Sequence, residues 1–194
     1  VRWQHPRRGL LAPAQFLPLI ENHRLGVDIG EWVIDSALRQ MAQWEQTGMP
    51  LPVSVNVSAD HLQQADFSAR LRAMLGAHKS VGPHRLELEI LETGALTDLD
   101  RVATVMRDCA ELGVSFALDD FGTGYSSLLY LKHLPAGTLK IDSGFVRHLL
   151  HEADNLPILE CVLTLARSFG RTAVAEGIET VEQGTVLLQL GCEL

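Results

Sequence analysis

Short apolar runs rich in β-branched residues recur along the chain, and each is followed by a polar or glycine-containing segment. Such runs are typical of buried β-strands. The predicted strands cover residues 53–57, 85–91, 114–120, 138–142 and 172–175. Residues 1–3 resemble the end of a further strand, and a turn at 5–9 follows it.

Between these runs, apolar residues recur every three or four positions, which indicates amphipathic helices. The predicted helices cover residues 28–47, 67–75, 99–112, 127–132, 155–169 and 181–190, after a short helical segment at 13–23. Asp28 is a candidate N-cap of the first long helix, and Ser126 or Ser127 of the helix at 127–132. Gly48 and Gly113 are among the glycines that follow predicted helix ends.

Polar and charged side chains gather at the carboxyl ends of the predicted strands. They are Asn56, Glu89, Glu92, Asp119, Asp120, Lys140, Asp142, Glu176 and Glu179. An alternation of strands and helices predicts parallel strands with helical crossovers. An open parallel sheet concentrates its site at one switch point, whereas a closed barrel draws on the ends of many strands.

The distribution therefore favours an α/β fold of the (β/α)8 barrel type, formed as a single domain over residues 1–194. About six strand–helix units can be recognised, where a barrel needs eight. The chain begins within one unit and stops where another strand is expected. We therefore expect a barrel that is incomplete at both ends.

The composition limits the classes of partner. The chain has 194 residues, of which 46% are hydrophobic, and a formal net charge of −8. That size supports one sizeable core, and the acidic charge argues against a nucleic-acid polymer or an anionic membrane surface as partner. A small anionic ligand stays compatible, because bound metal ions can reverse the local field.

The cysteines and the hydropathy pattern indicate the compartment. Cys109 and Cys161 fall in apolar helical patterns, and with Cys192 they form no paired motif. We interpret them as reduced core cysteines of a reducing compartment. The sequence contains neither a signal peptide nor a long apolar span, so we expect a cytoplasmic domain without membrane contact, although a longer parent protein could be attached to a membrane.

Each polar residue also has a purely structural interpretation. Glu87 and Glu89 alternate in one strand and either could face solvent, Lys140 could be solvated, and Asn56 could form a turn. Glutamates such as Glu176 and Glu179 are also favoured in first helical turns. Two adjacent acids after a buried strand, Asp119 and Asp120, are the hardest to explain structurally, since their charges repel.

The oxygen-rich set of Asn56, Glu89, Asp119 and Asp120 favours hard cations such as Mg²⁺ or Mn²⁺. Two such ions with a bridging carboxylate suit the hydrolysis of a phosphodiester. A nearby lysine, Lys140, could orient the attacking water or stabilise charge in the transition state.

Several motifs, taken in their order along the chain, resemble those of the EAL domain, the bacterial phosphodiesterase that linearises cyclic di-GMP. These motifs are Arg2-Trp3-Gln4-His5-Pro6, Ser54-Val55-Asn56-Val57-Ser58, Leu88-Glu89-Ile90-Leu91-Glu92, Asp119-Asp120-Phe121-Gly122-Thr123-Gly124, Lys140-Ile141-Asp142 and Ala175-Glu176-Gly177-Ile178-Glu179-Thr180. The resemblance extends along the whole chain. It implies a modified barrel with one strand antiparallel, two Mg²⁺ or Mn²⁺ ions and cleavage to linear pGpG.

The resemblance also implies a role for each matching residue. Metal ligands would be Asn56, Glu89, Asp119, Asp120 and Glu176, with Glu176 serving the second ion or its water. Lys140 would hold the attacking water, and Arg2 would contact a substrate phosphate. Glu92 would anchor the loop after Asp120 and couple it to a homodimer interface, and Asp142 and Glu179 would be supporting residues.

The family's Glu-Ala-Leu signature would immediately precede Val1, and a Gln-Gly-Tyr segment would follow Leu194. Sensor or diguanylate cyclase domains often accompany such domains in longer proteins. Two alternatives stay open at this point. One is a non-catalytic receptor or protein-interaction module of the same family, and the other is an unrelated Mg²⁺ barrel such as an enolase-type lyase.

Overall fold

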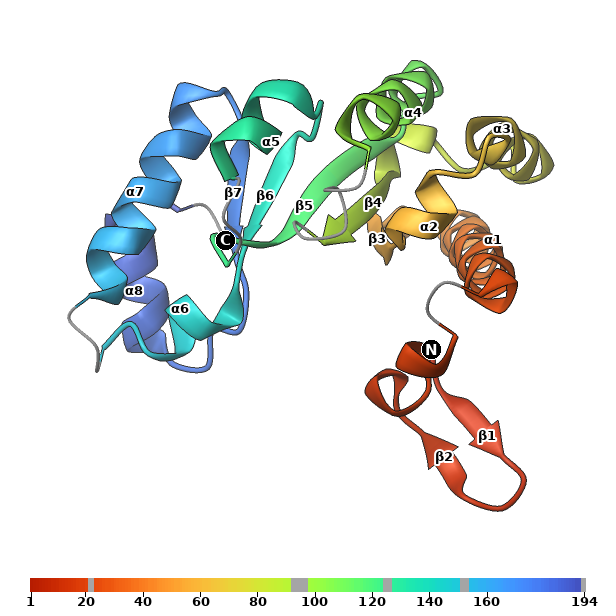
Figure 1. Ribbon diagram of the computed structural model, residues 1–194, viewed down its shortest axis with the longest axis horizontal. Helices are drawn as coiled ribbons and strands as arrows, with labels where there is room; N and C mark the ends of the chain where they lie inside the picture. Colours follow the sequence, from red (N-terminus) through yellow and green to blue (C-terminus); the bar gives the residue numbers. More distant parts are fainter. Residues whose placement is uncertain (21–22, 92–97, 124–126, 151–153, 193–194) are drawn as a thin grey trace.

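A sheet of parallel strands forms the centre of the computed structural model (Figure 1). The structure describes residues 1–20, 23–91, 98–123, 127–150 and 154–192. The strands of this sheet are β3 (Val53–Asn56), β4 (Leu86–Leu91), β5 (Ser115–Phe121), β6 (Thr138–Ile141) and β7 (Thr172–Ala175). All five lie where the sequence predicts strands.

The strands pair in the order in which they occur in the chain, β3-β4-β5-β6-β7, and every pairing is parallel. A doubly wound sheet reverses its order at a switch point, whereas the wall of a barrel adds each new strand beside the last. The order therefore agrees with the barrel prediction. The antiparallel strand that the resemblance implies is not among these five.

Helices connect the strands and lie along the outside of the curved sheet (Figure 1). They are α1 (Arg24–Gln46), α2 (Ala59–Leu62), α3 (Phe67–Ala77), α4 (Leu99–Glu111), α5 (Ser127–His133), α6 (Ser143–Arg147), α7 (Asn155–Ser168) and α8 (Val181–Gln189). The longer helices confirm the predictions. The prediction missed α2 and α6, which are too short to show a repeating apolar pattern.

The start of α1 differs from the prediction. The helix begins at Arg24, and its N-cap is His23, whose Nδ1 accepts a hydrogen bond from the backbone N of Leu25. Asp28, the predicted N-cap, therefore lies inside the helix. The end is as predicted, because Gly48 has a φ of 73° just after the C-cap.

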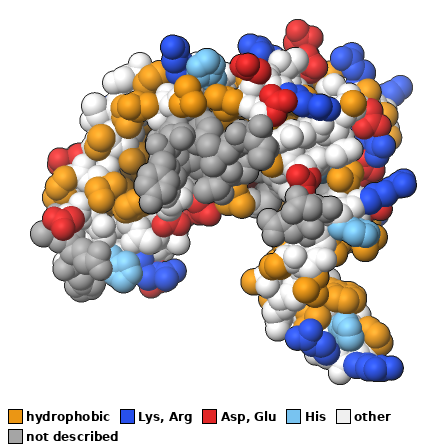
Figure 2. All heavy atoms as spheres, in the orientation of Figure 1, with side chains coloured by type: hydrophobic (Ala, Val, Ile, Leu, Met, Phe, Trp, Pro, Cys, Tyr) orange, Lys and Arg blue, Asp and Glu red, His pale blue; other side chains and the backbone are white. Residues whose placement is uncertain are grey.

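The N-terminal residues form a hairpin apart from the main sheet (Figure 1). In place of a strand end, β1 (Trp3–His5) pairs antiparallel with β2 (Gly9–Leu11) around the predicted turn. Two 3₁₀ turns, Pro13–Gln15 and Leu17–Leu19, replace the expected short helix, and a third precedes β4 at Pro83–Arg85. Figure 2 shows hydrophobic side chains on this hairpin, and the exposed ones include Trp3 and Leu10.

The core lies between the sheet and the helices. Strand residues such as Phe116, Leu118 and Leu139 are fully buried. Helix α4 also contributes buried residues to the core, namely Val102, Ala103, Met106 and Cys109. The prediction of a core position is wrong for Cys161, because it lies on the exposed side of α7, whereas Cys109 and Cys192 are buried. None of the three cysteines forms a disulfide. None of the described helices is long and apolar enough to cross a membrane.

The contact between α1 and α2 gives the first prediction. A Cβ at Gly30 of α1 would clash with Nδ1 of His61, a residue that is 2% exposed and whose ring packs edge-on against Phe67. Because this buried ring has little room to move, Gly30→Ala should lower the free energy of unfolding by about 1–3 kcal/mol in urea denaturation.

Gly76→Ala is the matched control. Gly76 also lies in a helix, α3, but a Cβ there meets no atom within 4 Å. The control should leave stability unchanged or raise it by up to about 1 kcal/mol, because alanine favours the helix. Equal effects of the two substitutions would contradict the proposed packing of His61.

Candidate active site

The polar residues singled out in the sequence lie at the carboxyl ends of the parallel strands. Asn56 is the last residue of β3, and Glu89 lies in β4. Asp119 and Lys140 lie near the ends of β5 and β6, and Glu176 directly follows β7. Parallel strands bring these positions to one edge of the sheet, as the sequence predicts.

Lys140 lies at the centre of this group. Its Nζ is 2.8 Å from Oε1 of Glu89 and 3.6 Å from Oδ1 of Asp119, and it also forms an ion pair with Glu176. These partners come from β4, β5 and the residue after β7. One ammonium therefore links carboxylates from three separate segments of the chain.

Asn56 extends the group onto β3. Its Nδ2 donates a hydrogen bond to Oε2 of Glu89 at 3.0 Å, while the other carboxylate oxygen of Glu89 faces Lys140. Both oxygens of the buried Glu89 side chain therefore have partners. A buried carboxylate with both oxygens paired is held in one orientation.

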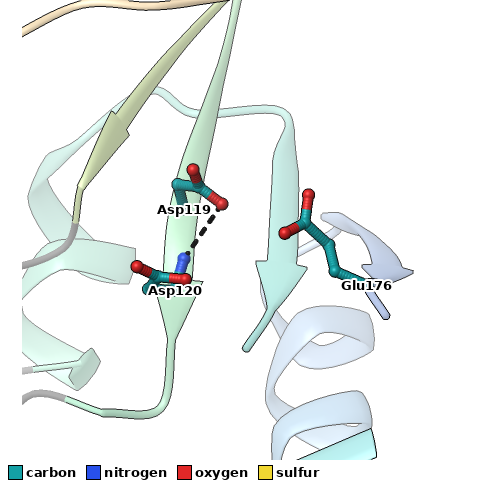
Figure 3. A group of neighbouring side chains, drawn as sticks. All are labelled: Asp119, Asp120 and Glu176. Atoms are coloured by element: carbon teal, nitrogen blue, oxygen red, sulfur yellow. Dashed lines mark hydrogen bonds between the residues drawn. The ribbon is translucent and has the colours of Figure 1, made fainter. Parts of the chain in front are cut away.

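Asp119 and Asp120 both contribute to the site, although successive residues of a regular strand point to opposite faces. Asp120 has a φ of 52°, and the register between β5 and β6 shifts between Leu118 and Phe121. The backbone N of Asp120 donates to Oδ1 of Asp119 at 3.1 Å (Figure 3). This irregularity in the strand turns the second aspartate toward the first.

The carboxylates of Asp119, Asp120 and Glu176 converge (Figure 3). Each offers one oxygen, and these oxygens all lie within 4.8 Å of one another. Asp119 is buried, and the other two are partly buried. A group of this kind could hold a hard cation, which prefers oxygen ligands.

The pKa values of two of these carboxyl groups are raised. Burial raises the pKa of Asp119, and the neighbouring Glu176 and Glu89 add to this, although Lys140 opposes it. Burial also raises the pKa of Asp120, as do the adjacent Asp119 and Asp142. A cation bound among these oxygens would remove the repulsion, so the donor set fits a divalent metal.

The pKa of Lys140 is also raised. Burial alone would lower it, but the hydrogen bonds to Glu176 and Glu89 outweigh that effect. The side chain is therefore a cation over the whole neutral range. Its charge is placed where carboxylates from several strands would otherwise repel one another.

Other residues predicted for the site have different surroundings. Oδ1 of Asp142 caps α6 by accepting a hydrogen bond from the backbone N of Gly144, and its carboxyl group also contacts Asp120. Glu179 is exposed and lies 3.8 Å from Nε of Arg147. The described contact of exposed Arg2 is a hydrogen bond to the carbonyl of Val1. Glu92 lies outside the described residues.

Glu87 is a polar residue of β4 that the sequence analysis does not assign to the site. Glu87 and Glu89 are two residues apart in β4, so their side chains lie on the same face of the sheet. The carboxylate of Glu87 accepts hydrogen bonds from Ser54 and Thr138. The spacing of two residues from Glu89 was the only signal in the sequence for this position. The spacing could not identify the partners of Glu87, because they are 33 and 51 residues away in the chain.

Comparison with known proteins identifies the family. A family model described as EAL domain matches residues 1–194. The chain belongs to the EAL domain family. The resemblance seen in the motifs is thereby confirmed for the whole length of the chain.

Two relatives of this EAL domain come from Pseudomonas aeruginosa. The bifunctional diguanylate cyclase/cyclic di-GMP phosphodiesterase MucR is 45% identical over 193 residues, which are 99% of this chain and 28% of MucR. The cyclic di-GMP phosphodiesterase PA2567 is 36% identical over 192 residues, which are 99% of this chain and 32% of that protein. The chain thus spans about a third or less of these relatives.

A solved structure supports the fold of this EAL domain. The structure called PaMucR phosphodiesterase, c-di-GMP complex, matches with a TM-score of 0.91 and 44% sequence identity. The match covers 99% of this chain and 78% of the PaMucR chain. EAL domains are modified barrels, so the prediction of a barrel-type α/β fold is confirmed.

The position of Lys140 gives a prediction about stability. With a chelator present, Lys140→Met should lower the free energy of unfolding by about 1–3 kcal/mol, because Glu89, Asp119 and Glu176 would face one another without a cation. Adding Mn²⁺ should recover part of the loss. Urea denaturation with and without metal measures both effects.

The control is Lys132→Met in the last turn of α5, where the side chain is exposed. This substitution should change stability by less than about 0.5 kcal/mol. Similar losses in the two variants would show that Lys140 does not offset charge repulsion in the folded protein.

Proposed function

We propose that this EAL domain hydrolyses a phosphodiester bond of cyclic di-GMP to give linear pGpG. The observation that carries the proposal is the convergence of Asp119, Asp120 and Glu176 beside Lys140 at the carboxyl ends of the strands. The named activities of MucR and PA2567 support the same reaction. The fold is similar to that of PaMucR, which was solved in complex with cyclic di-GMP, and this similarity supports the same ligand for this chain.

The carboxylates would hold two Mg²⁺ or Mn²⁺ ions, with Asn56 and Glu89 as further ligands. The fit rests on the oxygen donors within 4.8 Å and on the raised pKa values of Asp119 and Asp120. Bound metal supplies an activated water and neutralises charge on the phosphate oxygens. Glu176 would serve the second ion or its water.

Lys140 would hold the attacking water. Its ammonium carries donors that the surrounding carboxylates orient, and its raised pKa keeps it charged. A fixed cation beside the reacting phosphate would also stabilise the negative charge that develops in the transition state. The contacts of Glu89 with Asn56 and Lys140 would hold the metal ligands and the attacking water in fixed relative positions.

The remaining residues have supporting roles in this proposal. Arg2 would contact a substrate phosphate, Glu92 would anchor the loop after Asp120, and Asp142 and Glu179 would support their neighbours. Asp142 is well placed for this, because it caps α6 and contacts Asp120. We treat residues 1–194 as a single domain of this type.

The assembly around the domain is also part of the proposal. The region after Asp120 would form a homodimer interface, and sensor or diguanylate cyclase domains would be attached in a longer protein, as the name of MucR suggests. The three cysteines, none of them in a disulfide, support a reducing, cytoplasmic location. The reaction would lower the level of the second messenger there.

Turnover of cyclic di-GMP tests the function directly. The purified protein should convert cyclic di-GMP to pGpG with Mg²⁺ or Mn²⁺, measured by chromatography, and a chelator should abolish the reaction. Asp119→Asn should lower kcat/KM by about 100-fold or more, because a metal at such a site supplies several kcal/mol of stabilisation.

The control is Asp108→Asn, which removes an exposed carboxylate from α4 and should leave turnover unchanged. Binding of cyclic di-GMP without turnover in the unmodified protein would contradict the proposal and indicate a receptor. Equal turnover by Asp119→Asn and the unmodified protein would contradict the assigned site.

A further inference from the structure

Two glutamates of β4 bridge the same two strands. Glu89 contacts Asn56 of β3 and Lys140 of β6. Two residues earlier, Glu87 accepts a hydrogen bond from Oγ of Ser54 in β3 at 3.1 Å and another from Oγ1 of Thr138 in β6 at 2.8 Å. We call the second set, Ser54, Glu87 and Thr138, the Glu87 bridge.

The two bridges are related by a step of two residues on every strand. Ser54 precedes Asn56 by two positions, Glu87 precedes Glu89, and Thr138 precedes Lys140. A step of two keeps side chains on the same face of a sheet. The Glu87 bridge therefore lies directly beneath the contacts that orient Glu89 and Lys140.

Both glutamates reach across β5, which lies between β4 and β6. Ala117 of β5 pairs with Glu89 on one side and with Thr138 on the other, and it is fully buried. Its side chain is a single methyl group, which takes up little space between the longer side chains on either side. The bridges thus link side chains of β4 and β6 across β5, in addition to the backbone pairing of these strands.

The Glu87 bridge differs from the upper contacts in its chemistry. It uses two neutral hydroxyl donors, and Glu87 forms no ion pair within the described part of the chain. Its contribution is directional, because each hydroxyl donates to a separate carboxylate oxygen. Together the two hydroxyls connect Glu87 to β3, the neighbouring strand, and to β6, which lies two strands away.

We propose that Glu87 is a positioning residue that acts through Ser54 and Thr138 to hold Asn56, Glu89 and Lys140 in place. The inference deepens the proposed function, on which it rests, by assigning a supporting layer to the metal and water site. Outer contacts of this kind commonly affect metal affinity and turnover without touching metal or substrate. Glu87 should therefore affect Mn²⁺ binding and kcat more than KM.

Glu87→Leu and Glu87→Gln form the main test. The leucine removes both contacts at similar size, and it should lower Mn²⁺ affinity and kcat by about 10-fold or more, with KM for cyclic di-GMP unchanged. The glutamine retains one acceptor and one donor for the same hydroxyls, so it should recover most of both quantities. Electron paramagnetic resonance of free Mn²⁺ gives the affinity independently of activity.

Thr138→Val tests the bridge with a side chain of the same shape, in case Glu87→Leu does not fold. Loss of one hydrogen bond should weaken Mn²⁺ binding by about fivefold. Thr172→Val is the matched control, because Thr172 pairs with Thr138 in the sheet register but belongs to neither bridge. It should leave both quantities unchanged.

The outcomes separate this inference from the proposed function. Weaker Mn²⁺ binding by Glu87→Leu and Thr138→Val supports the inference even if the unmodified protein does not hydrolyse cyclic di-GMP. Unchanged Mn²⁺ affinity in folded Glu87→Leu or in Thr138→Val overturns it. Equal losses in Glu87→Leu and Glu87→Gln also overturn it, as does an unmodified protein that binds no Mn²⁺.

Discussion

The ammonium of Lys140 contacts carboxylates from β4, β5 and the segment after β7, and the arrangement of the site depends on these contacts. Parallel strands bring their carboxyl ends together, so acids at those ends repel unless a cation lies between them. One lysine offsets only part of this charge, and the pKa values of Asp119 and Asp120 stay raised. Under the proposed function, cations bound at this negative potential would reverse the local field and so allow an anionic diester to approach.

The backbone contributes as much as the charges do. A regular β5 would direct Asp119 and Asp120 to opposite faces, but the positive φ of Asp120 and the register shift beside β6 turn both toward the site. A non-glycine residue with positive φ costs free energy, which the surrounding sheet offsets. Ala117 contributes through its size and not through strain, because its small side chain leaves space for residues of β4 to reach β6. Strain at one position and small size at another both shape the same edge of the sheet.

Much of the fold could be predicted from local patterns. Apolar runs located β3 to β7, and apolar spacing located the longer helices, because burial on one side imposes a period on the sequence. The short helices α2 and α6, the hairpin of β1 and β2, and the start of α1 at Arg24 were not predicted. Short elements bury too few residues to show a period, and a histidine such as His23 is an uncommon N-cap. Cys161 shows that an apolar stretch of helix still has an exposed side.

The sequence by itself determined the order of strands and helices, the polar residues at the strand ends and, through its motifs, the family. These properties depend on neighbours along the chain or on short fixed spacings. Only the tertiary structure decided which side chains meet: Lys140 with Glu89, Asp119 and Glu176, and Glu87 with Ser54 and Thr138. These partners are far apart in the chain and come together through the register of parallel strands. Register depends on the packing of the whole sheet against its helices, so no local stretch of sequence specifies it.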